Sequence, residues 1–77
     1  MNTELEEMIE KYNKKMKEVK SKLKIVASGS EEKDGNTIFT LTMNERKFRN
    51  KKMIKEVYVI RFADETRRLN YLHYFAD

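Results

Sequence analysis

The first two dozen residues have an amphipathic pattern that predicts a long helix. Apolar side chains recur there at intervals of four and three residues, which places them on one stripe of a helix. Thr3 followed by Glu6 is typical of a capping box at a helix start. We expect this helix to extend from about Thr3 to Leu23. Its stripe consists of Leu5, Ile9, Tyr12, Met16, Val19 and Leu23.

This stripe has two possible uses. It can pack onto the chain's own sheet, or it can pair with the same helix of a second subunit. Residues 1–10 sum to a charge of −4 and residues 11–24 to +6, so an antiparallel pair would place opposite charges side by side. We therefore expect a homodimer. The predicted interface comprises Leu5, Ile9, Tyr12, Met16 and Val19.

Two later segments alternate between apolar and other residues, which is typical of strands. These are Thr37–Met43 and Ile54–Phe62, and the two runs joined by a polar loop, which contains Glu45–Lys52, predict an antiparallel hairpin. Lys24–Ser28 is a short candidate strand. The turn-rich segment Gly29–Asn36 predicts a loop.

The C-terminal residues predict a short second helix that begins after Asp64, a favourable capping residue. Its inward stripe is expected to be Leu69, Leu72 and Ala76, with Arg67, Tyr71 and Tyr74 on the opposite side. The chain is thus predicted to be one small α+β domain, residues 1–77, with the order α-β-β-β-α. A three-stranded antiparallel sheet would be combined with a long N-terminal and a short C-terminal helix.

The composition excludes several classes of function. The chain has no cysteine and one histidine, so disulfides, thiolate metal sites and a cysteine nucleophile are absent. We expect no enzyme activity, no metal and no cofactor. No segment approaches the roughly 20 apolar residues of a membrane span, so we expect no membrane partner. The absence of cysteine suits a cytoplasmic protein, which is the location we expect. The lysine- and asparagine-rich composition without proline is typical of an AT-rich genome, such as that of a low-GC bacterium or its phage.

The segment between the two alternating runs is the strongest candidate for a binding site. It places five basic residues within seven positions around Phe48. Cations neutralise phosphates, and an aromatic face can stack an unpaired base. The alternative is a solvated turn whose lysines protect the sheet edge. We expect phosphate contacts from Arg46, Lys47, Arg49, Lys51 and Lys52, stacking on Phe48, auxiliary contacts from Arg67 and Tyr71, and a further positive surface at Lys15, Lys20 and Lys22.

These features favour a small basic regulatory protein that binds nucleic acid, RNA more than duplex DNA, as a homodimer. No helix presents the side chains expected of a major-groove reader, whereas aromatic residues alternate with the basic ones. The alternative is a phage- or bacterium-encoded inhibitor or adaptor that docks on an acidic protein surface. The same basic segment would serve that function.

The element order is similar to that of double-stranded-RNA-binding domains. In that family the loop between the first two strands and the start of the last helix contact RNA. Here that loop contains Glu31, Glu32 and Asp34, and the last helix opens with Asp64 and Glu65. The similarity is therefore confined to the order of the elements.

Overall fold

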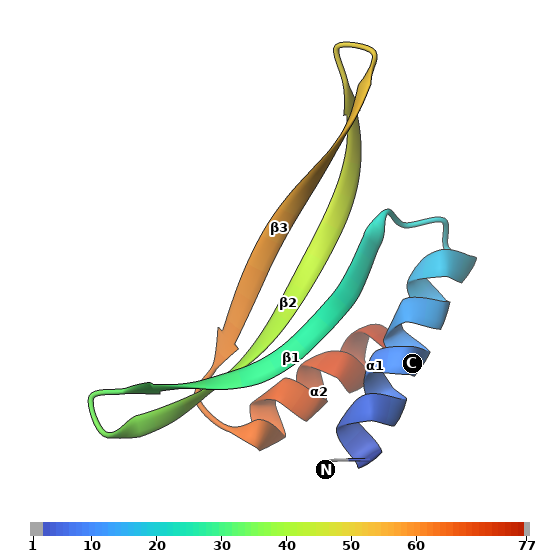
Figure 1. Ribbon diagram of the computed structural model, residues 1–77. Helices are drawn as coiled ribbons and strands as arrows, with labels where there is room; N and C mark the ends of the chain where they lie inside the picture. Colours follow the sequence, from blue (N-terminus) through green and yellow to red (C-terminus); the bar gives the residue numbers. More distant parts are fainter. Residues whose placement is uncertain (1–2, 77) are drawn as a thin grey trace.

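The computed structural model describes residues 3–76, which form two helices and one three-stranded sheet (Figure 1). The order of the elements confirms the predicted α+β fold with an antiparallel sheet. Neither of the two helices is an apolar segment of membrane-spanning length. The elements are α1 (Thr3–Glu18), β1 (Leu23–Lys33), β2 (Asn36–Arg49), β3 (Lys52–Phe62) and α2 (Glu65–Ala76).

Helix α1 ends at Glu18, earlier than its apolar spacing predicts. The chain leaves the helix through a Schellman-type turn, in which the Ser21 N–H donates to the Met16 carbonyl at 2.8 Å. Lys20 has the positive φ of 60° that this turn requires, at a position where glycine is the usual residue. Because a lysine there is no stop signal, the predicted end at Leu23 was wrong. Leu23 begins β1 instead.

The strands are joined by two tight turns, Asp34–Gly35 and Asn50–Lys51. All four residues have positive φ, between 52° and 78°, as type I′ turns require. Two loop predictions were therefore wrong. Most of residues 29–36 belongs to strands, and the basic segment 45–52 is a strand pair closed by a two-residue turn. In both places the backbone pairing with β2 continues through polar residues that show no apolar alternation.

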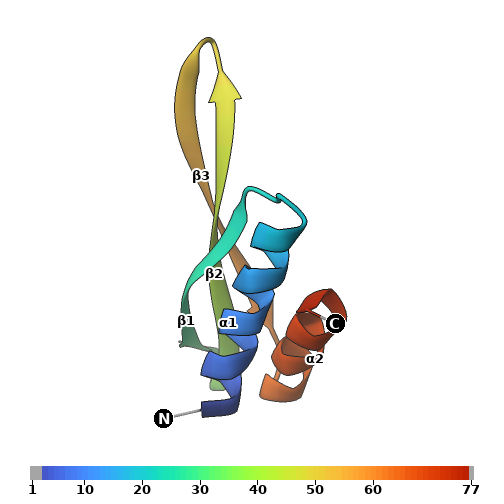
Figure 2. The ribbon, with the colours of Figure 1, turned by 90° about the vertical axis from the view of Figure 1, so that its right-hand side faces the viewer.

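The sheet has the strand order β1-β2-β3 and two distinct faces. Leu41 lies opposite Ile60 on the face that packs against the helices, as the alternation predicts. A bulge at Val26 shifts the register of β1 between Ile25 and Ala27, and so Ile25 still faces the helices. Both helices lie on this one side of the curved sheet (Figures 1 and 2). We call the opposite, open side the outer face.

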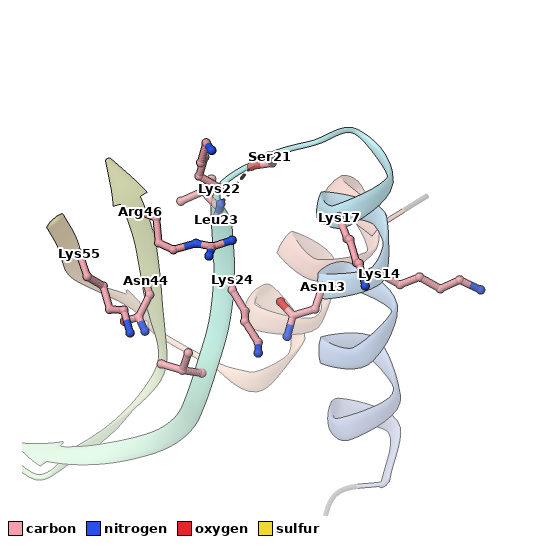
Figure 3. A pocket seen from close by; sticks show the side chains of 11 residues that line it. Asn13, Lys14, Lys17, Ser21, Lys22, Leu23, Lys24, Asn44, Arg46 and Lys55 are labelled. Atoms are coloured by element: carbon pink, nitrogen blue, oxygen red, sulfur yellow. Dashed lines mark hydrogen bonds between the residues drawn. The ribbon is translucent and has the colours of Figure 1, made fainter. Parts of the chain in front are cut away.

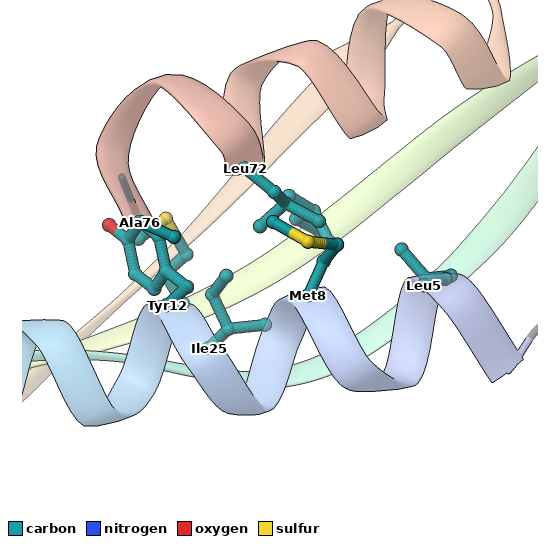
Figure 4. Close-up of a cluster of buried hydrophobic side chains, with 8 residues drawn as sticks. Leu5, Met8, Tyr12, Ile25, Leu72 and Ala76 are labelled. Atoms are coloured by element: carbon teal, nitrogen blue, oxygen red, sulfur yellow. The ribbon is translucent and has the colours of Figure 1, made fainter.

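The core lies between the helices and the sheet (Figure 4). Tyr12 is only 1% exposed, and this burial, followed by the neighbouring Tyr71, raises the pKa of the Tyr12 phenol to about 12. The two helices meet through an aromatic contact, with the Tyr12 and Tyr71 ring centroids 6.5 Å apart. The buried apolar residues are Leu5, Met8, Tyr12, Ile25, Leu41, Met43, Leu72 and Ala76.

Most of the apolar stripe on α1 packs against the core of its own chain. Leu5 and Tyr12 are buried within the chain, and Ile9 and Met16 pack against the same cluster. Only Val19 is well exposed, at 57%. Leu5 and Tyr12 of the predicted dimer interface are thus used for packing within the chain, and the homodimer itself stays a prediction.

Helix α2 follows its predicted pattern except at Tyr71, which was expected on the side away from the core but packs against it. The Asp64 carboxylate accepts a hydrogen bond from the Arg67 N–H at 2.8 Å and caps the helix. Leu72 and Ala76 are buried, and Leu69 packs against the core, so the predicted inward stripe is confirmed.

Candidate nucleic-acid interface

Basic side chains line a hollow of about 710 Å³ beside the start of β1 (Figure 3). No aspartate or glutamate is among its lining residues. Figure 3 shows α1 with Lys17 on one side, Arg46 and Lys55 on the other, and Lys24 between them. We call it the basic hollow. Its six basic residues are Lys14, Lys17, Lys22, Lys24, Arg46 and Lys55.

One wall of the basic hollow is α1, which is attached to the edge of β1 by Asn13. The Asn13 amide nitrogen donates to the Ile25 carbonyl at 3.0 Å, and the Ile25 N–H donates to the Asn13 side-chain oxygen at 2.8 Å. One amide thus satisfies both backbone groups of an edge residue, as a neighbouring strand would. This contact holds the helix beside the sheet and places Lys14 and Lys17 at the rim.

The floor and the second wall of the hollow come from the sheet. Lys24 lies opposite Asn44, and Arg46 lies opposite Lys55, so their side chains are on the outer face. The Arg46 N–H also donates to the Lys22 carbonyl at 3.4 Å, which keeps the chain leading into β1 beside β2. The antiparallel register therefore gathers cations from three separate segments.

Beyond the start of β1, residues 46–55 continue as a two-stranded ribbon that we call the arm (Figure 1). On its outer face Phe48 lies opposite Met53, directly beyond the pair Arg46 and Lys55. Phe48 is 71% exposed and Met53 58%. The arm thus extends the hollow with an accessible aromatic ring on the same face.

The opposite face of the arm has a different character at its root. Lys47 is 3.5 Å from a Glu45 carboxylate oxygen and 3.2 Å from one of Glu56. The Tyr58 hydroxyl donates to both carboxylates. Hydrogen bonds from Tyr58 and then Lys47 lower the pKa of Glu56, and Glu56 in turn raises the pKa of Lys47. Lys47, which the sequence predicts as a phosphate contact, is neutralised by these carboxylates.

The other predicted site residues fall into two groups. Arg49, Lys51 and Lys52 are exposed at the far end of the arm, with Arg49 opposite Lys52 on the face that lies away from the hollow. Arg67 and Tyr71 are on α2, far from the arm in the fold. Arg46 therefore lines the hollow, and Phe48 lies next to it on the outer face of the arm. The other three cations lie at the tip of the arm, and the two residues predicted to make auxiliary contacts lie apart from it on α2.

Both residues that were predicted to make auxiliary contacts interact with other parts of the fold. The Arg67 side chain is 3.5 Å from the Asp64 carboxylate. The Tyr71 ring packs against Phe62 at 5.4 Å and Phe75 at 4.8 Å, in addition to Tyr12.

Four residues of the basic hollow escaped the sequence prediction, namely Lys14, Lys17, Lys24 and Lys55. Lys14 and Lys17 are three residues apart and so lie on one side of the helix. This spacing was the sequence feature from which the helical wall of the hollow could have been predicted. Of the three lysines proposed to extend the positive surface, Lys22 lines the hollow, whereas Lys15 and Lys20 do not.

The arrangement can bind anions but contains no evident metal centre. Within residues 3–76 no group of three or more His, Cys, Asp or Glu side chains could hold a metal ion. Comparison of the chain with protein-family models, with curated proteins and with solved structures found no match.

Proposed function

We propose that this protein binds single-stranded nucleic acid, RNA in preference to duplex DNA. The strand would lie in the basic hollow and continue along the outer face of the arm. The observation that supports this proposal is the gathering of six cations around one hollow that no carboxylate lines. The positive electrostatic potential of six neighbouring cations attracts a polyanion, and the cations can neutralise consecutive phosphates.

Phe48 favours a single strand over a duplex. Its ring is exposed beside Arg46 on the same face, where an unpaired base can stack on it. Bases inside a duplex are already stacked on each other and do not reach such a ring. Asn44 adds a neutral hydrogen-bonding group among the cations, suited to a ribose hydroxyl.

Titration of a fluorescent single-stranded RNA at several salt concentrations tests the proposal. Log K should fall linearly with log salt, with a slope of about −4 if all six cations contact phosphates, at about −0.7 per contact. Absence of binding to mixed-sequence RNA at about 50 mM salt would contradict the proposal.

A pair of variants with equal charge locates the site. Arg46→Glu combined with Lys55→Glu removes two of the proposed contacts, so affinity should fall at least about 20-fold and the slope should become shallower by about 1.4. The matched control is Lys33→Glu with Arg67→Glu, which changes the net charge equally at exposed positions outside the hollow. Equal losses in both variants would indicate a general charge effect and no site at the hollow.

A second candidate function is that of an inhibitor or adaptor that docks on an acidic protein surface. The observation in its favour is an aromatic surface on α2 away from the hollow, where Tyr74 is 80% exposed and Phe75 41%. Aromatic residues of this kind often anchor protein interfaces. RNA affinity that is absent, or insensitive to the Arg46 and Lys55 substitutions, would favour this candidate.

A further inference from the structure

The two edges of the sheet are treated differently by the fold. On the β1 edge, α1 lies alongside, and Asn13 bonds both backbone groups of Ile25. Strand β3 forms the other edge, and no strand of residues 3–76 pairs with its free side. An uncovered edge strand is a template for pairing with another chain.

The turn geometry identifies the backbone groups that β3 offers. A two-residue turn at Asn50–Lys51 makes Arg49 and Lys52 a hydrogen-bonded pair. Alternate residues from Met53 onward therefore direct their N–H and C=O groups away from β2. These residues are Met53, Lys55, Val57, Val59 and Arg61.

The same strand has a concentration of exposed apolar surface. Val57 is 62% exposed, Met53 58%, Val59 41% and Tyr58 37%. Four of the nine large apolar or aromatic side chains that are exposed in residues 3–76 thus belong to β3. Val57 and Val59 lie near the middle of the strand, away from both turns.

We propose that β3 pairs with β3 of a second copy of this chain, antiparallel, with Val57 on the two-fold axis. In this register Lys55 lies opposite Val59 of the second copy. Ile54 lies opposite Ile60, and Glu56 lies opposite Tyr58, the same type of contact that the Tyr58 hydroxyl makes with Glu56 inside one chain. Opposed apolar pairs and the absence of opposed like charges make the strand complementary to itself.

The neighbouring registers are unfavourable, which makes the proposed one specific. A shift by two positions in one direction places Glu56 opposite Glu56, and a shift in the other direction places Lys55 opposite Arg61. Like charges directly opposite each other destabilise a strand pair. In the proposed register Lys52 lies opposite Phe62, so the basic turn of one copy lies beside Asp64 of the other.

The resulting dimer would contain one continuous six-stranded sheet. Because the two-fold axis is perpendicular to the sheet, both outer faces point to the same side. Two basic hollows would therefore share one face, which would allow one strand of nucleic acid to engage both. The pairing itself does not depend on nucleic acid, so it can be tested separately.

Light scattering after gel filtration, at about 100 µM protein, measures the assembly directly. The wild-type mass should be twice the 9.3 kDa of one chain. Val57→Lys places two lysines against each other on the axis and should return the mass to that of one chain, with an unchanged circular-dichroism spectrum. Val57→Thr, a β-branched control without charge, should remain dimeric. A monomeric wild type, or a Val57→Lys variant that stays dimeric, would overturn the proposal.

Hydrogen exchange provides a second readout on the unmodified protein. The Val57 and Val59 N–H groups point to the free edge, so they should exchange slowly in the dimer and rapidly after dilution to the monomer. Rapid exchange of both amides at about 100 µM, where Ile60 remains protected, would also overturn the proposal.

Discussion

The two hairpins of this sheet have the same turn but opposite chemistry. Asp34–Gly35 closes the β1–β2 hairpin and Asn50–Lys51 closes the arm, in both cases with two residues of positive φ. Residues 31–34 sum to a charge of −2, whereas residues 46–55 sum to +6. One backbone arrangement therefore presents an acidic tip at one end of the molecule and a basic arm at the other (Figure 1).

The two hairpins also differ in what supports them. The β1–β2 hairpin is tied to α2 by Arg68, which is 5% exposed and donates to the Gly29 carbonyl at 3.0 Å and the Thr40 carbonyl at 3.1 Å. Neither α1 nor α2 packs against the arm, and its root is held by the Arg46 hydrogen bond to the Lys22 carbonyl and by the polar contacts of Lys47 with Glu56 and of Glu56 with Tyr58. The anchored hairpin thus contributes to the fold, and the projecting one is available for binding.

Removal of the buried anchor should have the largest effect on stability. Arg68→Met leaves the Gly29 and Thr40 carbonyls without their charged donor and removes the 2.6 Å contact between Arg68 and Glu65, so unfolding free energy should fall by about 2–4 kcal/mol. Arg67→Met is the adjacent control, because its side chain is 71% exposed, and it should change stability by less than about 0.5 kcal/mol. Urea unfolding measures both, and similar midpoints would contradict the anchoring role.

Truncation of Phe48 should separate binding from stability at the arm. Its ring is 71% exposed, so Phe48→Ala should leave the urea midpoint unchanged. Loss of one stacked base costs about 1–3 kcal/mol, which corresponds to a loss of roughly 5- to 150-fold in RNA affinity. Phe48→Trp, which keeps a ring, should bind at least as well as the wild type. An unchanged RNA affinity of Phe48→Ala would show that no base stacks on the Phe48 ring.

Exchange of the turn residues should sharpen the contrast between the hairpins. Lys51 has a φ of 62°, which is unfavourable for a lysine, so Lys51→Gly should stabilise the fold by about 0.5–1 kcal/mol. Gly35→Ala, at a φ of 78° and with no atom within 4 Å of the added carbon, should destabilise by about 1 kcal/mol through the backbone alone.

The same pair tests whether the lysine at the tip serves binding. Lys51→Gly should weaken RNA binding about threefold by loss of one phosphate contact, despite the gain in stability. Gly35→Ala should leave affinity unchanged. A variant of Lys51 that is more stable and binds equally well would show that this lysine has no part in the site.

Acidification should loosen the arm before the anchored hairpin. The pKa of Glu56 is lowered in the folded state, so its contribution to stability is present above the ordinary pKa of 4.5 and is lost as the pH falls through the lower folded-state value. The effect should be small, because the cluster is exposed. Carboxyl-carbon NMR shifts of Glu56 follow the titration, and Tyr58→Phe should move its pKa back toward the ordinary value. The same Glu56 pKa in the wild type and in Tyr58→Phe would show that the Tyr58 hydroxyl does not stabilise the Glu56 carboxylate.

The sequence predicted those elements whose apolar pattern reflects burial. The α1 stripe and the pairing of β2 with β3 follow from Tyr12, Leu41 and Ile60, which contact the core. The end of α1 and the length of β1 could not be predicted from the apolar pattern. Lys20 occupies a position typical of glycine, and the polar residues 28–33 are exposed and pair with β2 through their backbone without an apolar pattern.

The candidate site was predictable only in part, because tertiary structure assembles it. The cluster around Phe48 is local in sequence and was found, although Lys47 proved to be neutralised by Glu45 and Glu56. The basic hollow joins α1 to the β2–β3 ribbon across about thirty residues of chain, and its existence depends on the Asn13 contact with β1. No local pattern contains that information.

The most direct measurement is an NMR titration of the isotope-labelled protein with a short single-stranded RNA. Amide shifts should change at the hollow and along the outer face of the arm, from Lys22 and Lys24 through Arg46 and Phe48 to Lys55, and those of Glu31–Gly35 should stay unchanged. Shift changes confined to α2, or spread equally over both hairpins, would contradict binding at the basic hollow.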